Sequence, residues 1–342
     1  GSTLGGEKII NQPYVIGKKY SASVSFDNLN SYILKNNIPL ENTSFNFFDV
    51  NNYQIKGMLY NPSTEKYYAV VIRNNSSYIY EYSKDMELLR QNFITNDLPY
   101  NRYLAPSIFH LNPSNNNLHI ETTNGSFEID KNSLNIVQKY INTEKPGSLR
   151  AVLRNDILFT YDTSSYSLYL EVKNVKTNNI IISEKLNVKT GTFLAYGGTL
   201  SNDGKYLYVP DYKESKGTIY KIINDNLEKV IDFEGNYSVK FYNNKAIYVV
   251  NQDIFLVDLD SKATESFQPL NARISSSYDS FSNKLLLKKD GYAEIYDFKS
   301  KTLKALNYEE TKDDRSYDEY HYIFLQNNRL VYTKGMYFDN YW

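Results

Sequence analysis

The stretch that decides the fold is Ser201-Asn202-Asp203-Gly204-Lys205-Tyr206-Leu207-Tyr208-Val209. Its Asn-Asp-Gly turn leads into a run whose side chains would alternate between the two faces of a sheet, which is typical of a β-strand. Variants of the phrase stand at residues 60–72, 111–120, 242–250 and 278–287. The sequence is therefore that of a repeat protein, in which one small unit is used many times.

The composition between these turns favours strands along the whole chain. The 342 residues include 34 Tyr and 17 Phe, and aromatic and β-branched residues are enriched in strands. Sustained helical periodicity is missing, and the best helical candidate, residues 83–92, also fits an edge strand after a hairpin turn. Aligning the repeats predicts first strands that start 36–50 residues apart, near Tyr53, Tyr103, Leu149, Tyr196, Tyr237, Arg273 and Tyr320.

This spacing predicts an all-β, seven-bladed β-propeller of four-stranded antiparallel blades, since such a blade takes roughly 40–50 residues. The spacing also admits six or eight blades. Residues 1–18 are interpreted as a tag scar with a flexible lead-in, and residues 19–342 as a single propeller domain. We expect the ring to close through N-terminal strands that pair with the short C-terminal blade. The predicted blades lie near residues 53–96, 103–142, 149–188, 196–233, 237–268, 273–308 and 320–342, the last completed by residues from 20–50.

Residues 200–211 resemble the YVTN repeat of bacterial surface and periplasmic β-propellers, because their Asn-Asp-Gly turn is followed by Lys-Tyr-Leu-Tyr-Val. Residues 257–264, Val-Asp-Leu-Asp-Ser-Lys-Ala-Thr, are similar to the strand, turn and strand that close such blades. The resemblance covers roughly residues 50–340 at the level of the fold. It implies a propeller and brings no catalytic residues with it.

Charge and composition narrow the classes of function. The net charge of -1 gives no global field that would attract nucleic acid. No apolar run in the sequence approaches the roughly 18–20 residues that span a bilayer. The absence of cysteine rules out disulfides and thiolate metal sites within it. We expect an extracytoplasmic protein, periplasmic or at the cell surface, whose signal peptide or lipid anchor is not in the sequence.

The histidines and nucleophile motifs offer little catalytic chemistry. His110, His119 and His321 are scattered and lack the spacing of metal ligands, so packed or surface roles are expected. The role of His321 is the least decided of the three, because this residue begins the first strand of the last blade. The sequence has no nucleophile elbow, no Ser-x-x-Lys and no glycine-rich phosphate loop. No cofactor and no metal is predicted.

Two groups of acidic residues have simple structural interpretations. Asp258, Asp260 and Glu265 resemble part of a calcium loop, but the glycine of its sharp turn is missing, and a hairpin turn explains the same residues. The acidic stretch at residues 309–319 is interpreted as a solvated connection between the sixth and seventh blades.

A propeller gathers distant residues on one face. The starts of the first strands and the turns between second and third strands project to the same face and form a collar around the central channel. Tyrosine offers a flat apolar ring with a polar tip, and arginine a fork for carboxylate, sulfate or phosphate. The predicted ligand-binding residues are Tyr53, Arg73, Arg102, Tyr103, Arg150, Tyr196, Asp211, Tyr237, Arg273, Tyr320 and His321, with Asp162, Tyr212, Gln252, Lys288 and Lys289 in the nearby turns.

Three hypotheses of function follow. The first is a non-catalytic extracytoplasmic propeller whose collar binds a small anionic or sugar ligand, or a protein of the cell envelope. The second is a propeller enzyme, a polysaccharide lyase or glycosidase, with Asp211 or Asp162 beside a Tyr or His321 as acid and base. The third is a scaffold subunit of a cell-envelope assembly. We expect no nucleic-acid partner for any of them.

Overall fold

Strands account for nearly all regular structure in the computed structural model of the chain. It describes residues 19–25, 44–49, 53–85, 87–99, 109–122, 125–141, 149–162, 167–187, 200–211, 214–235, 237, 239–242, 244–251, 253–269, 278–279, 283–289, 292–307, 319–327 and 329–336. The chain divides into two compact units, the first made of residues 1–109 and 269–342 and the second of residues 110–268.

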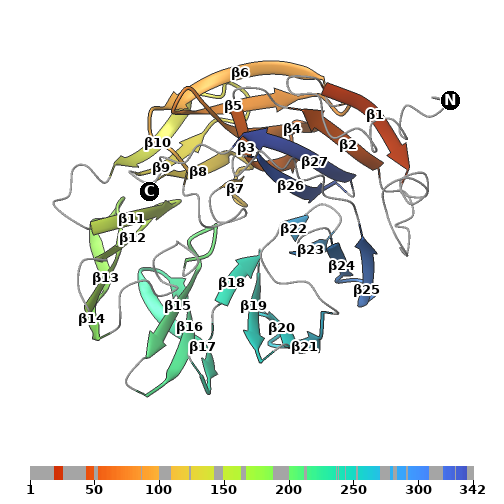
Figure 1. Ribbon diagram of the computed structural model, residues 1–342. Coiled ribbons are helices and arrows are strands. Elements are labelled where there is room, and N and C mark those ends of the chain that lie inside the picture. The colour runs from red at the N-terminus through yellow and green to blue at the C-terminus, as the bar shows by residue number, and fades with distance from the viewer. Residues whose placement is uncertain are drawn as a thin grey trace. The chain divides into compact units, whose positions relative to one another are not determined.

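The first unit contains three sheets, coloured orange, blue and red with blue in Figure 1. Two of them are antiparallel meanders in which each strand pairs with the next one along the chain. One consists of β3 (Tyr53–Asn61), β4 (Lys66–Arg73), β5 (Ser76–Tyr82) and β6 (Leu88–Thr95). The other consists of β22 (Tyr278–Asp279), β23 (Lys284–Lys289), β24 (Tyr292–Asp297) and β25 (Thr302–Asn307).

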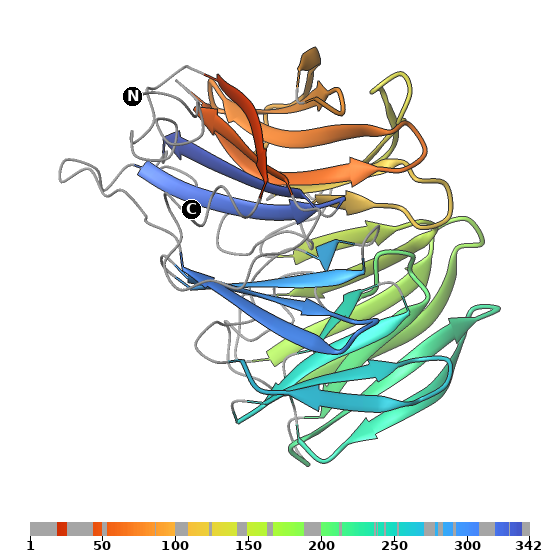
Figure 2. The ribbon, with the colours of Figure 1, turned by 90° about the vertical axis from the view of Figure 1, so that its right-hand side faces the viewer.

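The third sheet of this unit joins the two ends of the chain. Its strand order is β1-β2-β27-β26, and Figures 1 and 2 both show β27 beside β2. β2 runs parallel to β27, with Ser44 opposite Arg329 and Asp49 opposite Lys334. The predicted pairing of N-terminal strands with the last blade is therefore present, and it uses two strands. The strands are β1 (Lys19–Ser25), β2 (Ser44–Asp49), β26 (Glu319–Gln326) and β27 (Arg329–Met336).

The second unit contains four sheets, and three of them have four strands. The first is β7 (Phe109–Leu111), β8 (Leu118–Thr122), β9 (Gly125–Ile129) and β10 (Ile136–Ile141). The second is β11 (Leu149–Arg154), β12 (Ile157–Asp162), β13 (Ser167–Asn174) and β14 (Asn179–Asn187). The fourth is β18 (Val239–Tyr242), β19 (Lys245–Val250), β20 (Asp253–Asp258) and β21 (Thr264–Phe267).

The third sheet of this unit corrects the prediction of seven four-stranded blades. It has three strands, β15 (Tyr206–Asp211), β16 (Lys216–Ile223) and β17 (Asn226–Phe233). The strand expected to start near Tyr196 falls outside the described residues, and before β15 only Leu200 pairs, in an isolated bridge to Leu207. The described residues thus form six four-stranded blades, not seven. The fold class, an all-β propeller of four-stranded antiparallel blades, is confirmed at that level.

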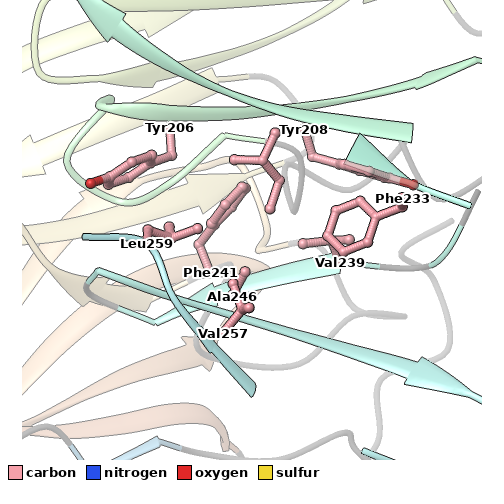
Figure 3. Close-up of a cluster of buried hydrophobic side chains, with 9 residues drawn as sticks. Tyr206, Tyr208, Phe233, Val239, Phe241, Ala246, Val257 and Leu259 are labelled. Carbon is pink, nitrogen blue, oxygen red and sulfur yellow. The ribbon is translucent and has the colours of Figure 1, made fainter. Parts of the chain in front are cut away.

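Alternate side chains of residues 206–209 pack into two different cores. Leu207 and Val209 pack with Val152 and Phe159 of the preceding sheet. Tyr206 and Tyr208 pack instead with residues of the following sheet, as Figure 3 shows. Since a buried large apolar side chain stabilises the fold by about 1.5–3 kcal/mol, alternation along one strand holds three sheets together. The residues drawn in Figure 3 include Phe233, Val239, Phe241, Ala246, Val257 and Leu259.

The geometry of the turn at residues 201–204 explains its sequence, Ser-Asn-Asp-Gly. The Ser201 hydroxyl accepts hydrogen bonds from the amides of Lys205 and Tyr206 at 3.1 and 2.9 Å. Gly204 has a φ of 72°, a conformation that favours glycine. A Cβ atom there would lie 2.6 Å from the Arg154 carbonyl oxygen. The turn is therefore built for close contact with the neighbouring sheet.

Amide side chains tie the hairpin turns of neighbouring sheets in the second unit. Asn155 donates to the Asp203 carbonyl oxygen at 2.8 Å, and Asn174 donates to Asp225 at 2.8 Å. Within the β18–β21 sheet, Asn244 of the first hairpin turn donates to Asp260 of the last one at 2.9 Å. The carboxylate of Asp258 accepts the amides of the turn that follows it, which also lowers its pKa. Asp258 and Asp260 therefore serve hairpin turns, as predicted, while Glu265 lies on β21.

Candidate ligand-binding site

The structure describes the side chains of two predicted collar residues, Arg73 and Tyr237. Tyr53, Arg150, Asp211, Tyr320 and His321 lie on strands β3, β11, β15 and β26, but their side chains lie outside the described part of the chain. Arg102, Tyr103, Tyr196 and Arg273 lie wholly outside it. The collar as a set stays a prediction.

Strand register brings the predicted positions together within individual sheets. Tyr53, at the start of β3, lies opposite Arg73, where β4 turns into β5. Leu149, at the start of β11, lies opposite Asp162, the end of β12. In each sheet the start of the first strand and the turn between second and third strands share one end. We call this the collar end of a sheet, and the other the hairpin end.

At the collar end of the β3–β6 sheet, the Arg73 side chain lies across its own sheet. Its guanidinium carbon is 5.6 Å from the centre of the Tyr78 ring, a cation–π distance. One guanidinium nitrogen donates to the Tyr80 hydroxyl at 3.2 Å and to the Gln91 amide oxygen at 2.9 Å. These two hydrogen bonds orient the guanidinium group.

A half-exposed aromatic ring lies near Arg73. Phe93 is 50 % exposed and meets the Tyr78 ring edge-on, with centroids 5.6 Å apart. Ser76, the buried cross-strand partner of Arg73, donates to Asn96 at 3.0 Å. The oriented guanidinium group of Arg73 therefore lies near the half-exposed ring of Phe93, and this pair of groups suits an anionic ligand with an apolar body.

At the collar end of the β18–β21 sheet, Tyr237 begins a row of stacked rings. Tyr237 stacks on Tyr248 with centroids 5.5 Å apart and planes at 17°. Tyr248 stacks in turn on Phe255, its cross-strand partner, at 5.2 Å and 13°. All three side chains are half-buried. We call Tyr237, Tyr248 and Phe255 the aromatic row.

The neighbouring sheet supports the aromatic row from behind. Phe233, at the end of β17, meets Tyr248 edge-on at 4.8 Å and Tyr237 at 5.9 Å. A Cβ atom on Gly235 would lie 2.9 Å from the Tyr237 ring, so this glycine leaves room for the ring. Burial, followed by the neighbouring Tyr237, raises the pKa of Tyr248. Its hydroxyl therefore stays protonated and can donate a hydrogen bond at neutral pH.

A buried polar cluster lies between the sheets of β8 and β11 in the second unit. Arg154 donates to Glu121 at 2.7 Å, and both side chains are almost fully buried. A second nitrogen of Arg154 lies 2.8 Å from Nε2 of His119, whose ring stacks on His110 at 4.7 Å. The interpretation of His110 and His119 as packed residues agrees with this burial. No pattern in the sequence indicated that Arg154 and Glu121, both within strands, form a buried ion pair.

Burial governs the ionisation of this cluster. It lowers the pKa of His119 well below the usual value, helped by the charge of Arg154. His119 is therefore a neutral acceptor for Arg154. Burial also raises the pKa of Glu121, and the attraction of Arg154 opposes that rise.

Two further features involve charged side chains of the first unit. Glu81 is 2 % exposed and accepts two hydrogen bonds from Arg90, at 2.9 and 2.7 Å. Lys56 sits where the register of β3 slips between Ile55 and Gly57, which is a β-bulge. Its side chain is 4 % exposed, and burial lowers its pKa to about 7.

Within the described residues, no group of three or more His, Cys, Asp or Glu side chains is arranged to hold a metal ion. The same residues include no helix long and apolar enough to cross a membrane.

Comparison with known proteins finds similar solved structures but no matching sequence family. No family model and no curated protein sequence matches it. Among solved structures, Hsv2p of Kluyveromyces lactis is similar at 9 % identity and a TM-score of 0.46, over 82 % of this chain and 97 % of that one. PorZ, an essential bacterial surface component of the type-IX secretion system of Porphyromonas gingivalis, is similar at 12 % identity and a TM-score of 0.40, over 74 % of this chain and 34 % of that one. We infer no function from these similarities.

Proposed function

We propose that this protein is an extracytoplasmic, non-catalytic β-propeller that binds an anionic or carbohydrate ligand, or a protein of the cell envelope, at the collar ends of its blades. The observation that carries the proposal is the Arg73 guanidinium held over the Tyr78 ring at 5.6 Å. This side chain combines a permanent charge with fixed orientation, and both are needed to recognise a carboxylate, sulfate or phosphate group.

Preorganisation is the reason to assign binding to this position. An arginine that moves freely in solvent loses side-chain entropy when it binds, and one already held in place loses less. Tyr80 and Gln91 hold Arg73 through uncharged acceptors. Phe93, half exposed beside Tyr78, supplies apolar contact for the body of the ligand.

Closure of the blades into a ring belongs to the same proposal. The parallel pairing of β2 with β27 supports closure, because it lets strands from one end of the chain finish a sheet that strands from the other end begin. Closed rings leave only short, protected sheet edges.

Binding to an array of acidic oligosaccharides, containing oligogalacturonates and sulfated hexasaccharides, tests the proposal. Replacing Arg73 with Gln should weaken binding at least tenfold and reduce its salt dependence. Lys84 gives the matched control, because it is a cation at the hairpin end of the same sheet, exposed and paired with Glu65 at 3.1 Å. Lys84→Gln should bind like the wild type. Equal affinity of the wild type and Arg73→Gln would overturn the proposal.

A further inference from the structure

We propose that the aromatic row is a stacking site for the pyranose rings of a neutral oligosaccharide. The inference deepens the proposed function and rests on it, because it specifies a ligand class for the collar end of the β18–β21 sheet. Tyr237 lies two residues before β18, Tyr248 lies on β19, and Phe255 lies opposite Tyr248 on β20.

The geometry of the row leaves ring faces uncovered. Neighbouring planes differ by 17° and 13°, yet the centroids are 5.5 and 5.2 Å apart. Near-parallel rings at such distances are offset rather than superimposed. A part of each face therefore remains available to another flat group, and all three side chains keep contact with solvent.

The support behind the row keeps it in place. Tyr237 and Tyr248 pack against the buried cluster of Figure 3, which contains Tyr208 and Phe233. The two edge-on contacts of Phe233 restrain the same two rings. A platform held by its own core needs little ordering when a ligand binds.

The angles between the rings of the aromatic row favour a sugar over a quaternary ammonium cation as the ligand. Aromatic sites for quaternary ammonium groups surround the cation with rings at steep angles, as a cage. The rings of the aromatic row are instead nearly parallel and offset-stacked, so what they offer a ligand is the uncovered part of a flat apolar face, which suits a pyranose ring. Tyrosine adds hydroxyl groups that can bond with sugar hydroxyls.

The neighbours of Phe255 favour a neutral sugar over an acidic one. Asp253 precedes Phe255 by two positions on β20, so both belong to one face of the strand, and Asp253 is exposed. Ser266 lies opposite Phe255 on β21 and is also exposed. The carboxylate can accept hydrogen bonds from sugar hydroxyls and repels uronic acids.

Direct binding measurements with defined sugars test this inference. Cellohexaose, mannohexaose and maltohexaose are titrated into the intact protein, with oligogalacturonate and tetramethylammonium as the competing ligand classes. We expect at least one neutral hexasaccharide to bind. Its affinity should fall at least tenfold in Tyr248→Ala and in Phe255→Ala and stay within threefold of the wild type in Tyr248→Phe, which keeps the ring.

Tyr220→Ala is the matched control, since Tyr220 is a half-buried tyrosine of the same unit that packs in a different cluster. It should bind like the wild type. Absence of binding by all three neutral sugars, binding of tetramethylammonium alone, or unchanged affinity in folded Phe255→Ala would overturn the inference. If oligogalacturonate still binds and depends on Arg73, the proposed function survives while this inference fails.

Discussion

Arg154 and Glu121 form an ion pair with a nitrogen-to-oxygen distance of 2.7 Å, and their side chains are 1 % and 2 % exposed. The pair links β11 of one sheet to β8 of its neighbour within the second unit. Two buried charges are stable only while each has its partner. Together with the contact of Arg154 to His119, the ion pair is a buried polar link between these two sheets.

Removing one partner should be much worse than removing both. Glu121→Leu leaves the Arg154 charge buried and should lower the free energy of unfolding by about 3–5 kcal/mol. Adding Arg154→Leu should recover a large part of that loss, as measured by urea denaturation in a double-mutant cycle. Additive losses would show that the pair is not coupled. The exposed pair Lys229–Asp232 is the control, and breaking it should leave the stability nearly unchanged.

His119 should make the fold sensitive to acid. Its pKa is lowered in the folded protein, so below about pH 6.5 the unfolded chain binds a proton that the folded chain refuses. Stability contributed by neutral His119 is therefore present above that pH and lost as the pH falls. Glu121, with its raised pKa, acts in the opposite direction, so the comparison needs a variant.

In His119→Gln, which keeps an acceptor for Arg154, the unfolding midpoint should fall less between pH 7 and pH 5 than in the wild type. Identical pH profiles of the two proteins would contradict the assignment of a neutral, buried His119.

Lys56 should have the same kind of window as His119, but at higher pH. Its pKa is about 7 in the fold and 10.5 when unperturbed, so between these values the unfolded chain holds the proton. Stability should therefore rise with pH from about 7 to 10.5. Lys56→Met should remove this rise and stabilise the protein at pH 6.5 by about 2 kcal/mol or more. Denaturant midpoints at pH 6.5 and 9.5 give the measurement, and a wild-type profile that is flat across this range speaks against the buried amine.

Gly204→Ala tests the turn that precedes β15. The φ of 72° and the approach of the Arg154 carbonyl oxygen to 2.6 Å both oppose a Cβ atom. We expect a loss of stability of more than about 1 kcal/mol, the scale of a strained left-handed residue. Lys205→Ala, an exposed neighbour, should leave the thermal midpoint nearly unchanged. A stable Gly204→Ala protein would mean that the two sheets do not pack closely at this turn.

Much of the fold was predictable because each blade is a local pattern. The first predicted blade, residues 53–96, corresponds to strands that run from Tyr53 to Thr95. Residues 83–92, interpreted as an edge strand, contribute to β6 (Leu88–Thr95). Hairpins of this kind are specified by turns and alternation within a few residues. The parallel direction of β2 against β27 could not be predicted, since nothing local encodes a pairing between the ends of the chain.

The sequence selected candidate positions for a site, but not the residues that pack beside them. Arg73 and Tyr237 were selected because they stand at strand ends. Tyr248 and Phe255 were missed, because only the cross-strand register brings them beside each other. The ion pair of Arg154 with Glu121 was missed for a related reason. A charged residue within a strand pattern is expected to face solvent, and only the packing of two sheets shows that both are enclosed.

Amide hydrogen exchange with and without a bound acidic or neutral hexasaccharide tests the central claim, binding at collar ends, most directly. The account predicts slower exchange in residues 73–77 of the β3–β6 sheet or residues 248–255 of the β18–β21 sheet. Slower exchange confined to hairpin-end turns such as residues 61–65 and 258–263 would contradict it.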